Sequence, residues 1–492
     1  MVEPAENPAL SKTRFLAGLQ CHKRLYLECF EPELATPIDT VRRFALDAGT
    51  TIGKLARERF PGGVLIDHAN LDHERAVTVT RQTLAAAPPA IYEAAATADN
   101  VRIRADLLVR DPVEGVDLVE VKSTTKVRPE HEWDMAIQFY VLERADVRVR
   151  RAYLMHLNRE YVYSGGEHEL KQLFVLQDLT ERVHALLADV ERELGRMRAG
   201  LQGGTPPPVA VGPHCEEPYK CSFYDHCHEG LPEDPFAALP RVTRKLRARF
   251  ESAGIATLDE PELDFRGLSL LQRRALEALK SGKRVVDPAA REALAAVRFP
   301  VHFVDFEAFS PAIPLYVGTR PYEAIPFQWS DHELRENGEL IHREFLHGGE
   351  GDPRREFAER LLEATEGAKS VMVYSNFEDQ RLADLQRFFP DLSEPLGALR
   401  LRLFDLLPVI RRHVYNGAFG GSFSIKAVLP ALVPHMGYDD LPIAEGSLAS
   451  VAFSEIVSAK ISAERRSELR NNLLAYCRRD TEAMCELFRV LR

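Results

Sequence analysis

The alternation of apolar and polar residues predicts a strand hairpin in the first quarter of the chain. Two runs of apolar and β-branched residues, 101–110 and 116–122, flank the segment DPVEG. Asp, Pro and Gly between two such runs are typical of a hairpin turn. The next segment, HEWDMAIQFYVLERA, has apolar residues at helical spacing, and RRAYLMHLN predicts a further strand. We therefore expect an α/β region here.

A second α/β pattern begins near residue 298. The segment VHFVDFEAFS predicts a strongly apolar strand, and AIPFQWSDHEL and LIHREFLHG predict two more. A helix, a strand and another helix follow, and the chain ends in a long helical segment, NNLLAYCRRDTEAMCELFRVL. Residues 231–297 contain short helical segments with turns between them. These patterns predict three parts: domains at 1–230 and 298–492, and a helical connector at 231–297.

Length and composition agree with a multidomain globular protein. The chain has 492 residues, which exceeds the size at which a single hydrophobic core usually stops growing. It has no apolar run long enough to span a bilayer and no apolar signal core near its start, so we expect a cytoplasmic protein without membrane partners. The net charge of −11 argues against a protein that coats nucleic acid. It does not argue against an enzyme with a locally basic, metal-loaded groove.

The predicted hairpin places charged residues where a metal could bind. Glu120 and Lys122 stand two residues apart on one strand, so their side chains point the same way. Antiparallel pairing can bring Asp106, on the other strand, beside Glu120. Two close carboxylates repel each other unless a cation such as Mg²⁺ neutralises them. Such an ion can polarise a phosphate, and Lys122 can orient the water or stabilise the transition state. The alternative is a cross-strand ion pair without a catalytic role.

The pattern D-x(13)-E-x-K resembles the PD-(D/E)XK nuclease superfamily. It is formed by Asp106, Glu120 and Lys122. The resemblance is to the RecB-like branch, which implies a catalytic role for Gln138 on the following helix. It also implies that Glu93 lies near the metal.

Two positions depart from the RecB-like pattern. Gly53 stands where these nucleases usually have a metal-binding His, and Leu142 stands where they have a Tyr, although Tyr140 is close in sequence. These departures imply a first metal site that is weakened or completed by other residues.

Three of the seven cysteines are regularly spaced. Cys215, Cys221 and Cys227 form the pattern C-x(5)-C-x(5)-C, whereas an odd number of cysteines in a long chain does not suggest a disulfide framework. Three thiolates need a fourth ligand to close a tetrahedral or cubane site. Cys21, at the other end of the same region, is the natural candidate.

One early cysteine and a late triplet around a RecB-like core resemble iron–sulfur nucleases. These are the AddB-type helicase-nucleases and the CRISPR-associated RecB-like exonucleases. The resemblance implies a [4Fe–4S] cluster on Cys21, Cys215, Cys221 and Cys227 that joins the two ends of the domain. Zn²⁺ on the same four sulfurs is the alternative, because four thiolates suit both and histidines surround the triplet. The other cysteines, Cys29, Cys477 and Cys485, are expected to be buried apolar residues.

A second group of acids lies in the C-terminal region. Asp305 and Glu307 stand two residues apart on an apolar strand, and Tyr476 and Asp480 share one face of the final helix. Carboxylates in such apolar surroundings favour a catalytic site. Lys426 follows glycines and serines at a predicted helix start, which can bind phosphate or simply be a capped helix.

The D-x-E strand and the terminal Y-x(3)-D pattern resemble the DnaQ-like 3′–5′ exonucleases of the DEDD family, which have an RNase H-like fold. The resemblance implies that Asp305, Glu307, Asp480 and one more acid hold two Mg²⁺ or Mn²⁺ ions. It implies that Tyr476 orients the attacking water. Glu378, in the segment YSNFED, is the expected fourth acid. Asp405 is the alternative, although a helix-capping or surface role is favoured for it.

The whole arrangement resembles a bacterial family that joins a RecB-like iron–sulfur nuclease to a DnaQ-like exonuclease. We therefore expect an α/β multidomain protein with a PD-(D/E)XK domain, a connector and an RNase H-like domain. The expected activity is metal-dependent hydrolysis of phosphodiester bonds, with single-stranded DNA ends as substrate and partner. One alternative is a nucleic-acid-binding or assembly subunit in which one or both sites are inactive. An iron–sulfur redox sensor that controls an attached nuclease is a third possibility.

Overall fold

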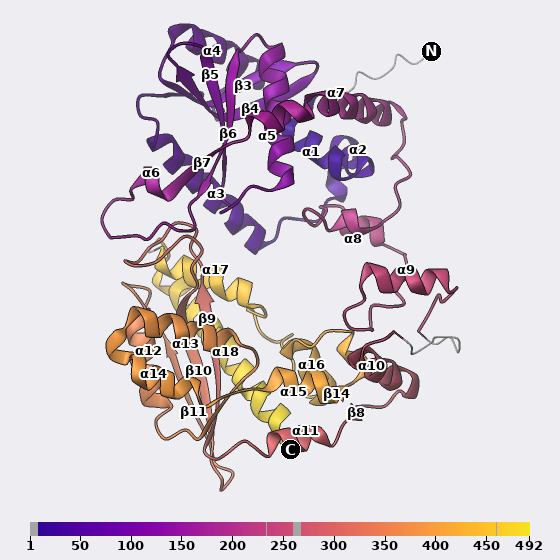
Figure 1. Cartoon of the computed structure of the whole chain (residues 1–492), viewed down its shortest axis with the longest axis vertical. Helices are drawn as coiled ribbons and strands as arrows, with labels where there is room; N and C mark the ends of the chain where they lie inside the picture. Colours follow the sequence, from indigo (N-terminus) through magenta and orange to yellow (C-terminus); the bar gives the residue numbers. More distant parts are fainter. Residues whose placement is uncertain (1–7, 233, 259–266, 459) are drawn as a thin grey trace. The chain divides into compact units, whose positions relative to one another are not determined.

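The computed structural model of the protein describes residues 8–232, 234–258, 267–458 and 460–492 (Figure 1). It is a mixed α/β structure with sheets of seven, five and two strands. The chain divides into two compact units. The first comprises the residues up to Leu231 together with Ala312–Tyr322, and the second comprises Pro232–Pro311 and Glu323–Arg492. The stretch 231–297 was expected as a separate connector; from Pro232 onward it groups with the second unit, and residues 312–322 group with the first.

The first unit is built on the seven-stranded sheet. Its strands are β1 (Leu10–Ser11), β2 (Val64–Leu65), β3 (Ala90–Ala98), β4 (Val101–Asp111), β5 (Gly115–Lys122), β6 (Val149–Leu157) and β7 (Phe174–Asp178). Its helices are α1 (Lys12–Gln20), α2 (His22–Phe30), α3 (Thr40–Glu58), α4 (His73–Ala86), α5 (Pro129–Arg144), α6 (Leu170–Leu173), α7 (Thr180–Gln202) and α8 (Tyr224–His228).

The strand order in this sheet is β2-β3-β4-β5-β6-β7, and β1 pairs with β4. The predicted hairpin is present: β4 and β5 are antiparallel, with Asp111 opposite Gly115 at the turn. β5 and β6 are parallel, and α5 makes the crossover between them. Helix α5 is buried along most of its length because it packs against β3, β4 and β6 on one side and α7 on another. It therefore holds its polar residues rigidly beside the hairpin.

The second unit contains the other two sheets. Its strands are β8 (Val285–Val286), β9 (Val301–Phe309), β10 (Ile325–Leu334), β11 (Leu340–Leu346), β12 (Ser370–Val373), β13 (Leu403–Asp405) and β14 (Val414–Tyr415). Its helices are α9 (Arg244–Ser252), α10 (Leu270–Ser281), α11 (Ala289–Leu294), α12 (Arg354–Ala364), α13 (Phe377–Phe388), α14 (Ser393–Arg400), α15 (Leu406–His413), α16 (Ile425–Leu432), α17 (Gly446–Val457) and α18 (Ala463–Leu491).

The five-stranded sheet has the order β11-β10-β9-β12-β13. β9, β10 and β11 are antiparallel neighbours, whereas β12 runs parallel to both β9 and β13. Alternate residues of β9 face opposite sides of this sheet. Val304 and Phe306 join an apolar core with residues of α12, α13 and α14, such as Phe357. Phe303 and Phe309 contact Phe488 of α18 and Phe453 of α17, so the odd-numbered positions face these two helices.

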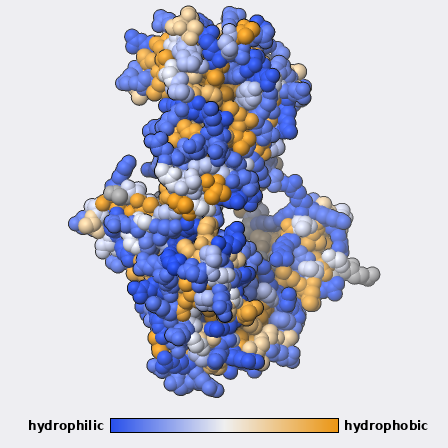
Figure 2. Space-filling model, turned by 60° about the vertical axis from the view of Figure 1, so that its left-hand side comes forward, coloured by the Kyte–Doolittle hydropathy of each residue, from blue (hydrophilic) through white to orange (hydrophobic). Residues whose placement is uncertain are grey.

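The surface is predominantly hydrophilic on the face drawn in Figure 2, and apolar residues form scattered patches there. Among the described residues, no helix is both long and apolar enough to cross a membrane.

Candidate functional site

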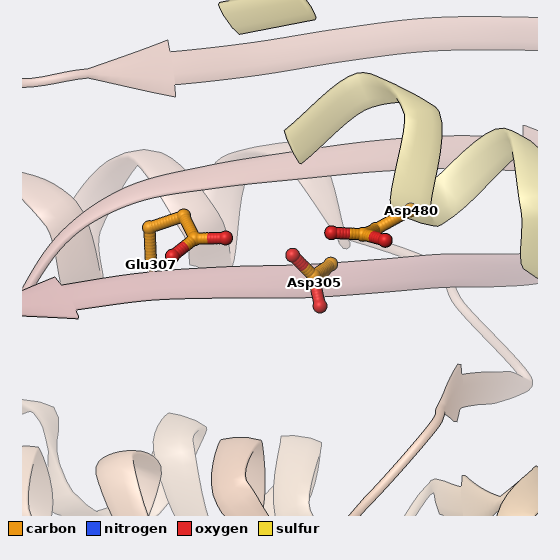
Figure 3. A group of neighbouring side chains, drawn as sticks. All are labelled: Asp305, Glu307 and Asp480. Atoms are coloured by element: carbon orange, nitrogen blue, oxygen red, sulfur yellow. The ribbon is translucent and has the colours of Figure 1, made fainter. Parts of the chain in front are cut away.

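Three carboxylates converge in the second unit. Asp305 and Glu307 are two residues apart on β9, and Asp480 lies on α18. One carboxylate oxygen from each lies within 4.8 Å of the others. Figure 3 shows the three side chains turned toward one another, two from the strand and one from the yellow helix. The period of two along β9 explains the arrangement, because it sends both acids toward α18 while Val304 and Phe306 enter the opposite core.

Holding the three acids in apolar surroundings is electrostatically unfavourable. Burial raises the pKa of Asp305 and of Glu307 well above the usual range, and the neighbouring carboxylates act in the same direction. Burial also raises the pKa of Asp480, to about 6, although hydrogen bonds from Tyr438 and Tyr476 oppose this rise. A divalent cation would remove both the repulsion and the desolvation penalty, and carboxylate oxygens are its preferred ligands. The group therefore fits a metal site.

Two tyrosines and a lysine surround these acids. The Tyr438 hydroxyl donates a hydrogen bond to Asp480 Oδ1. The Lys426 ammonium lies 5.1 Å from the ring centre of Tyr476 and 5.7 Å from that of Tyr438. Its charge lowers the pKa values of Glu307 and Asp480. Lys426 thus places a positive charge beside the acids.

Glu378 lies near these acids but outside the group of converging oxygens. It is in the first turn of α13, is 3% exposed, and borders apolar side chains such as Phe306 and Leu382. Its charge raises the pKa values of Asp305 and Glu307, which shows that it is close to both. Burial raises its own pKa to about 8. Among the described residues, the set of acids that could share one ion is Asp305, Glu307 and Asp480, without Glu378.

The two other acids of this region have structural partners. Asp405 caps α15, and its Oδ1 accepts a hydrogen bond of 2.9 Å from the Leu407 amide. Asp379 forms a two-fold hydrogen-bonded ion pair with Arg400. Asp405 thus has the helix-capping role that the sequence favoured for it.

The first unit brings together the charged residues of the hairpin. Glu120 is 1% exposed, and its Oε1 accepts hydrogen bonds from Lys122 Nζ at 2.7 Å and from Lys12 Nζ at 2.8 Å. Gln138 Nε2 donates to the other carboxylate oxygen at 2.8 Å. Asp106 Oδ2 accepts from the Val121 amide at 2.8 Å. Burial, with Glu120 nearby, raises the pKa of Asp106 to about 7.

Two members of this network were not anticipated from the sequence, namely Lys12 and Asp134. Asp134 Oδ2 accepts from Lys122 at 2.5 Å, and its Oδ1 accepts from Gln138 at 3.1 Å. Asp134 precedes Gln138 by one helical turn, so its place on the same face could have been inferred from the spacing. Lys12 is 108 residues away from Glu120, and no local pattern connects them.

The first site differs electrostatically from the second. Burial opposes the ionisation of Glu120, but the Lys12 and Lys122 ammonium groups lower its pKa below the usual range. Its carboxylate is already satisfied by two ammonium groups and an amide. Within the described chain, three His, Cys, Asp or Glu ligand atoms do not converge here. The residues present therefore do not fit an open multi-carboxylate metal site.

A cavity of about 670 Å³ borders this network. Asp106, Lys122, Glu93 and Gly53 line it. Glu93 has a positive φ of 57°, and its Oε1 accepts a hydrogen bond of 2.6 Å from Arg57. Positive φ at a non-glycine residue is uncommon and often marks a functional position. The structure thus places Glu93 at the cavity, together with Gly53, which stands where the nucleases that the sequence resembles usually have a His.

The four predicted cluster ligands line one small cavity. Cys21, Cys215, Cys221 and Cys227 all border it, although Cys21 is far from the others in sequence. Burial raises the pKa of Cys221, and Cys21 and Cys227 act in the same direction, so these thiols are neighbours. Yet no three of these four sulfurs lie within 4.8 Å of one another in the described structure. Tetrahedral zinc, with Zn–S bonds of about 2.3 Å, requires sulfurs about 3.8 Å apart.

The comparisons with known proteins give a family match for part of the chain. A family model described as "Domain of unknown function (DUF2779)" matches residues 302–424. This stretch includes Asp305, Glu307 and Glu378 but ends before Tyr476 and Asp480. No curated protein matches the chain. A solved structure titled "Crystal structure of SSO0001" has 12% identity and a TM-score of 0.21, and the match covers 39% of this chain and 75% of that one.

The repulsion among the acids of the second unit predicts a specific pH dependence. The pKa values of Asp480, about 6, and Glu378, about 8, exceed those of an unfolded chain. The folded metal-free protein therefore retains protons that the unfolded chain has lost, so its stability should fall as the pH rises from about 4 to about 8. Asp305→Asn should reduce this fall and raise stability near neutral pH by about 1–2 kcal/mol.

Thermal unfolding with a chelator, followed across this pH range, measures the effect. Mn²⁺ should stabilise the wild-type protein at neutral pH and the Asp305→Asn variant much less. Asp379→Asn, which neutralises an acid paired with Arg400 instead, is the control and should not reproduce this pattern. Equal pH profiles for the wild-type protein and the Asp305→Asn variant would show that the acids do not repel one another as described.

Proposed function

We propose that the protein is a metal-dependent nuclease whose main active site is the Asp305, Glu307 and Asp480 group. The convergence of these three oxygens within 4.8 Å supports the proposal most directly. Such a group is unfavourable unless cations bind it, and divalent cations held by carboxylates are the usual catalysts of phosphodiester hydrolysis. The strand order β11-β10-β9-β12-β13, with β9 at its centre, supports an RNase H-like fold for this unit.

Each residue of this site would have a distinct role. Asp305, Glu307 and Asp480 would hold the ions, which when bound activate water and stabilise negative charge on the phosphate. Tyr476, buried beside Asp480, would hold the attacking water by its hydroxyl. Lys426 would attract the phosphate backbone, because its ammonium places a positive charge next to the acids. Glu378 would complete the ligand set after a change of rotamer or of the α13 start.

Exonucleolytic cleavage of single-stranded DNA is the mode we propose, on the resemblance to DnaQ-like enzymes. The net charge of −11 means that recognition depends on local positive groups rather than on the overall field.

For the first unit we propose a RecB-like PD-(D/E)XK site joined to an iron–sulfur cluster. Its support is the convergence of Asp106, Glu120, Lys122 and Gln138 beside a cavity that Glu93 also lines. The cluster proposal is supported by the four cysteines that border one cavity. A [4Fe–4S] group would link the segment that follows α1 to the segment that follows α7.

One observation favours a second role for the first unit, namely nucleic-acid binding without cleavage. Glu120, the acid that should bind metal, is neutralised by two lysines and held by Gln138. A site in this state offers positive side chains to phosphate rather than free carboxylates to a metal. Cleavage and DNA-binding assays on variants of both units distinguish this binding role from a second nuclease activity.

The second unit should account for exonuclease activity. With end-labelled single-stranded DNA and Mn²⁺, Asp305→Asn and Asp480→Asn should each lower cleavage by about 10³-fold or more, because the ions lose a ligand. Tyr476→Phe should lower it by only about tenfold, because the ring still packs and only the hydroxyl is lost. Asp379→Asn is the matched control. Full activity of the Asp305→Asn/Lys122→Ala double variant would refute this assignment. Parallel assays on RNA determine whether DNA or RNA is the substrate.

Activity that survives Asp305→Asn should depend on Lys122. In that background, Lys122→Ala should lower cleavage by about 10²-fold while DNA binding stays nearly unchanged, since the lysine acts on the transition state. Lys126→Ala, which removes an exposed lysine four residues later, is the control. If Asp305→Asn alone removes all cleavage but leaves DNA binding, the first unit is a binding module.

The cysteine cavity should hold iron and sulfide. Protein purified without oxygen should be brown, and Cys21→Ser or Cys221→Ser should abolish the colour and destabilise the first unit. Cys29→Ser should keep the colour, because Cys29 packs against the apolar core and does not line the cavity. A colourless preparation with one tightly bound zinc would instead support the four-cysteine zinc site.

A further inference from the structure

The segment between α16 and α17 contributes a side chain to the acidic group of the second unit. Tyr438, in this segment, is 6% exposed, and its hydroxyl donates a hydrogen bond to Asp480 Oδ1. The Lys426 ammonium lies over the ring of the same tyrosine, 5.7 Å from its centre, which is within the range of a cation–π interaction. One side chain therefore lies against both a converging carboxylate and the positive charge beside it.

The backbone around Tyr438 is attached to the helix that carries Asp480. Arg479, the preceding residue of α18, donates to the Gly437 carbonyl and makes two hydrogen bonds of 2.9 Å to the Asp440 carboxylate. Gly437 and Asp440 stand on either side of Tyr438 in the chain. A two-fold bond between arginine and carboxylate fixes orientation as well as distance. The tyrosine is thus held in register with the carboxylate that it contacts.

Two tyrosine hydroxyls converge on Asp480. The second belongs to Tyr476, the residue proposed to hold the attacking water, and its ring centre lies 6.3 Å from that of Tyr438. A phenol has one proton to donate, so Tyr476 cannot donate to Asp480 and to a water at the same time. Because Tyr438 holds Asp480 independently, Tyr476 can turn to the water without releasing the carboxylate.

We propose that Tyr438 is a positioning residue of the second site, whose hydroxyl holds the Asp480 carboxylate for a divalent cation and whose ring holds the Lys426 ammonium for the phosphate. The proposal rests on the proposed function of the acidic group. A carboxylate can rotate about its terminal bond, and a hydrogen bond from a neighbouring group keeps a metal ligand oriented. The hydroxyl and the ring serve different partners, so each can be removed separately.

Mn²⁺ binding to the full chain tests the role of the hydroxyl. Free Mn²⁺ is followed by electron paramagnetic resonance, and the binding that Asp305→Asn removes is the binding to the acidic group. Tyr438→Phe should raise the dissociation constant of this Asp305-dependent binding by about tenfold, because Asp480 loses its orienting partner. Tyr415→Phe is the matched control: it removes a buried hydroxyl that donates to the Ala238 carbonyl, and it should leave the constant unchanged.

Cleavage kinetics test the role of the ring. The KM for single-stranded DNA is measured at saturating Mn²⁺ in a Lys122→Ala background, so that only the second site contributes. Tyr438→Phe should leave this KM unchanged, because a phenylalanine ring also attracts the Lys426 ammonium. Tyr438→Leu should raise it by about threefold or more, as Lys426→Met should. A purely structural role of Tyr438 would not separate the two constants in this way.

An unchanged or lower dissociation constant for Mn²⁺ in the Tyr438→Phe variant, with its circular dichroism intact, would overturn the proposal. If this variant does not fold, Asp440→Ala, which removes the exposed partner of Arg479, should weaken Mn²⁺ binding instead, and unchanged binding would count against the proposal equally. Wild-type protein without Asp305-dependent Mn²⁺ binding would refute the metal site itself and this role with it. Asp305-dependent binding that ignores Tyr438→Phe would refute this role alone.

Discussion

Buried carboxylates held close together need positive charge nearby, and both sites of this protein are organised around that requirement. Each ionised acid in a low-dielectric surrounding is unstable unless a cation lies within a few ångströms. The first unit supplies two ammonium groups to Glu120 from its own chain. The second unit places three acids together with Lys426 only at the side, over the rings of Tyr438 and Tyr476. This difference makes the second group the better candidate for a metal site.

The two folds meet this requirement by different means. In the second unit, a central strand contributes acids from one face while its other face completes an apolar core, and the last helix adds Asp480. In the first unit, a hairpin contributes Asp106, Glu120 and Lys122, and two helices add the remaining charges. In both cases the rigid apolar packing fixes the carboxylates, so binding a cation need not order the chain.

Local spacing predicted those parts of the sites that lie on one element. The i, i+2 pairs Glu120/Lys122 and Asp305/Glu307 point to common sides because a strand has a period of two. The Tyr476/Asp480 pair and the hairpin were likewise visible in the sequence. Lys12 and Tyr438 were not, because each reaches its acid from a segment with no sequence pattern that indicates the partner.

The boundaries of the two structural units were also predicted only in part from the sequence. A long loop between β9 and β10 gives no pattern that assigns it to a unit, yet residues 312–322 group with the first. There the Tyr163 amide donates to the Thr319 carbonyl, and the Gly318 amide donates to the Tyr163 carbonyl. Such pairing depends on contacts between distant residues rather than on periodicity. The position of Glu378, buried just outside the three acids, is set by tertiary packing in the same way.

The most direct measurement is the anomalous scattering of manganese in crystals soaked with Mn²⁺. The account predicts strong manganese peaks coordinated by Asp305, Glu307 and Asp480, with the carboxylate of Glu378 turned toward them. Crystals of the Asp305→Asn variant should lack these peaks. Well-ordered wild-type acids without manganese, at a concentration that supports catalysis in this class of enzyme, would contradict the claim that this group is a metal-dependent active site.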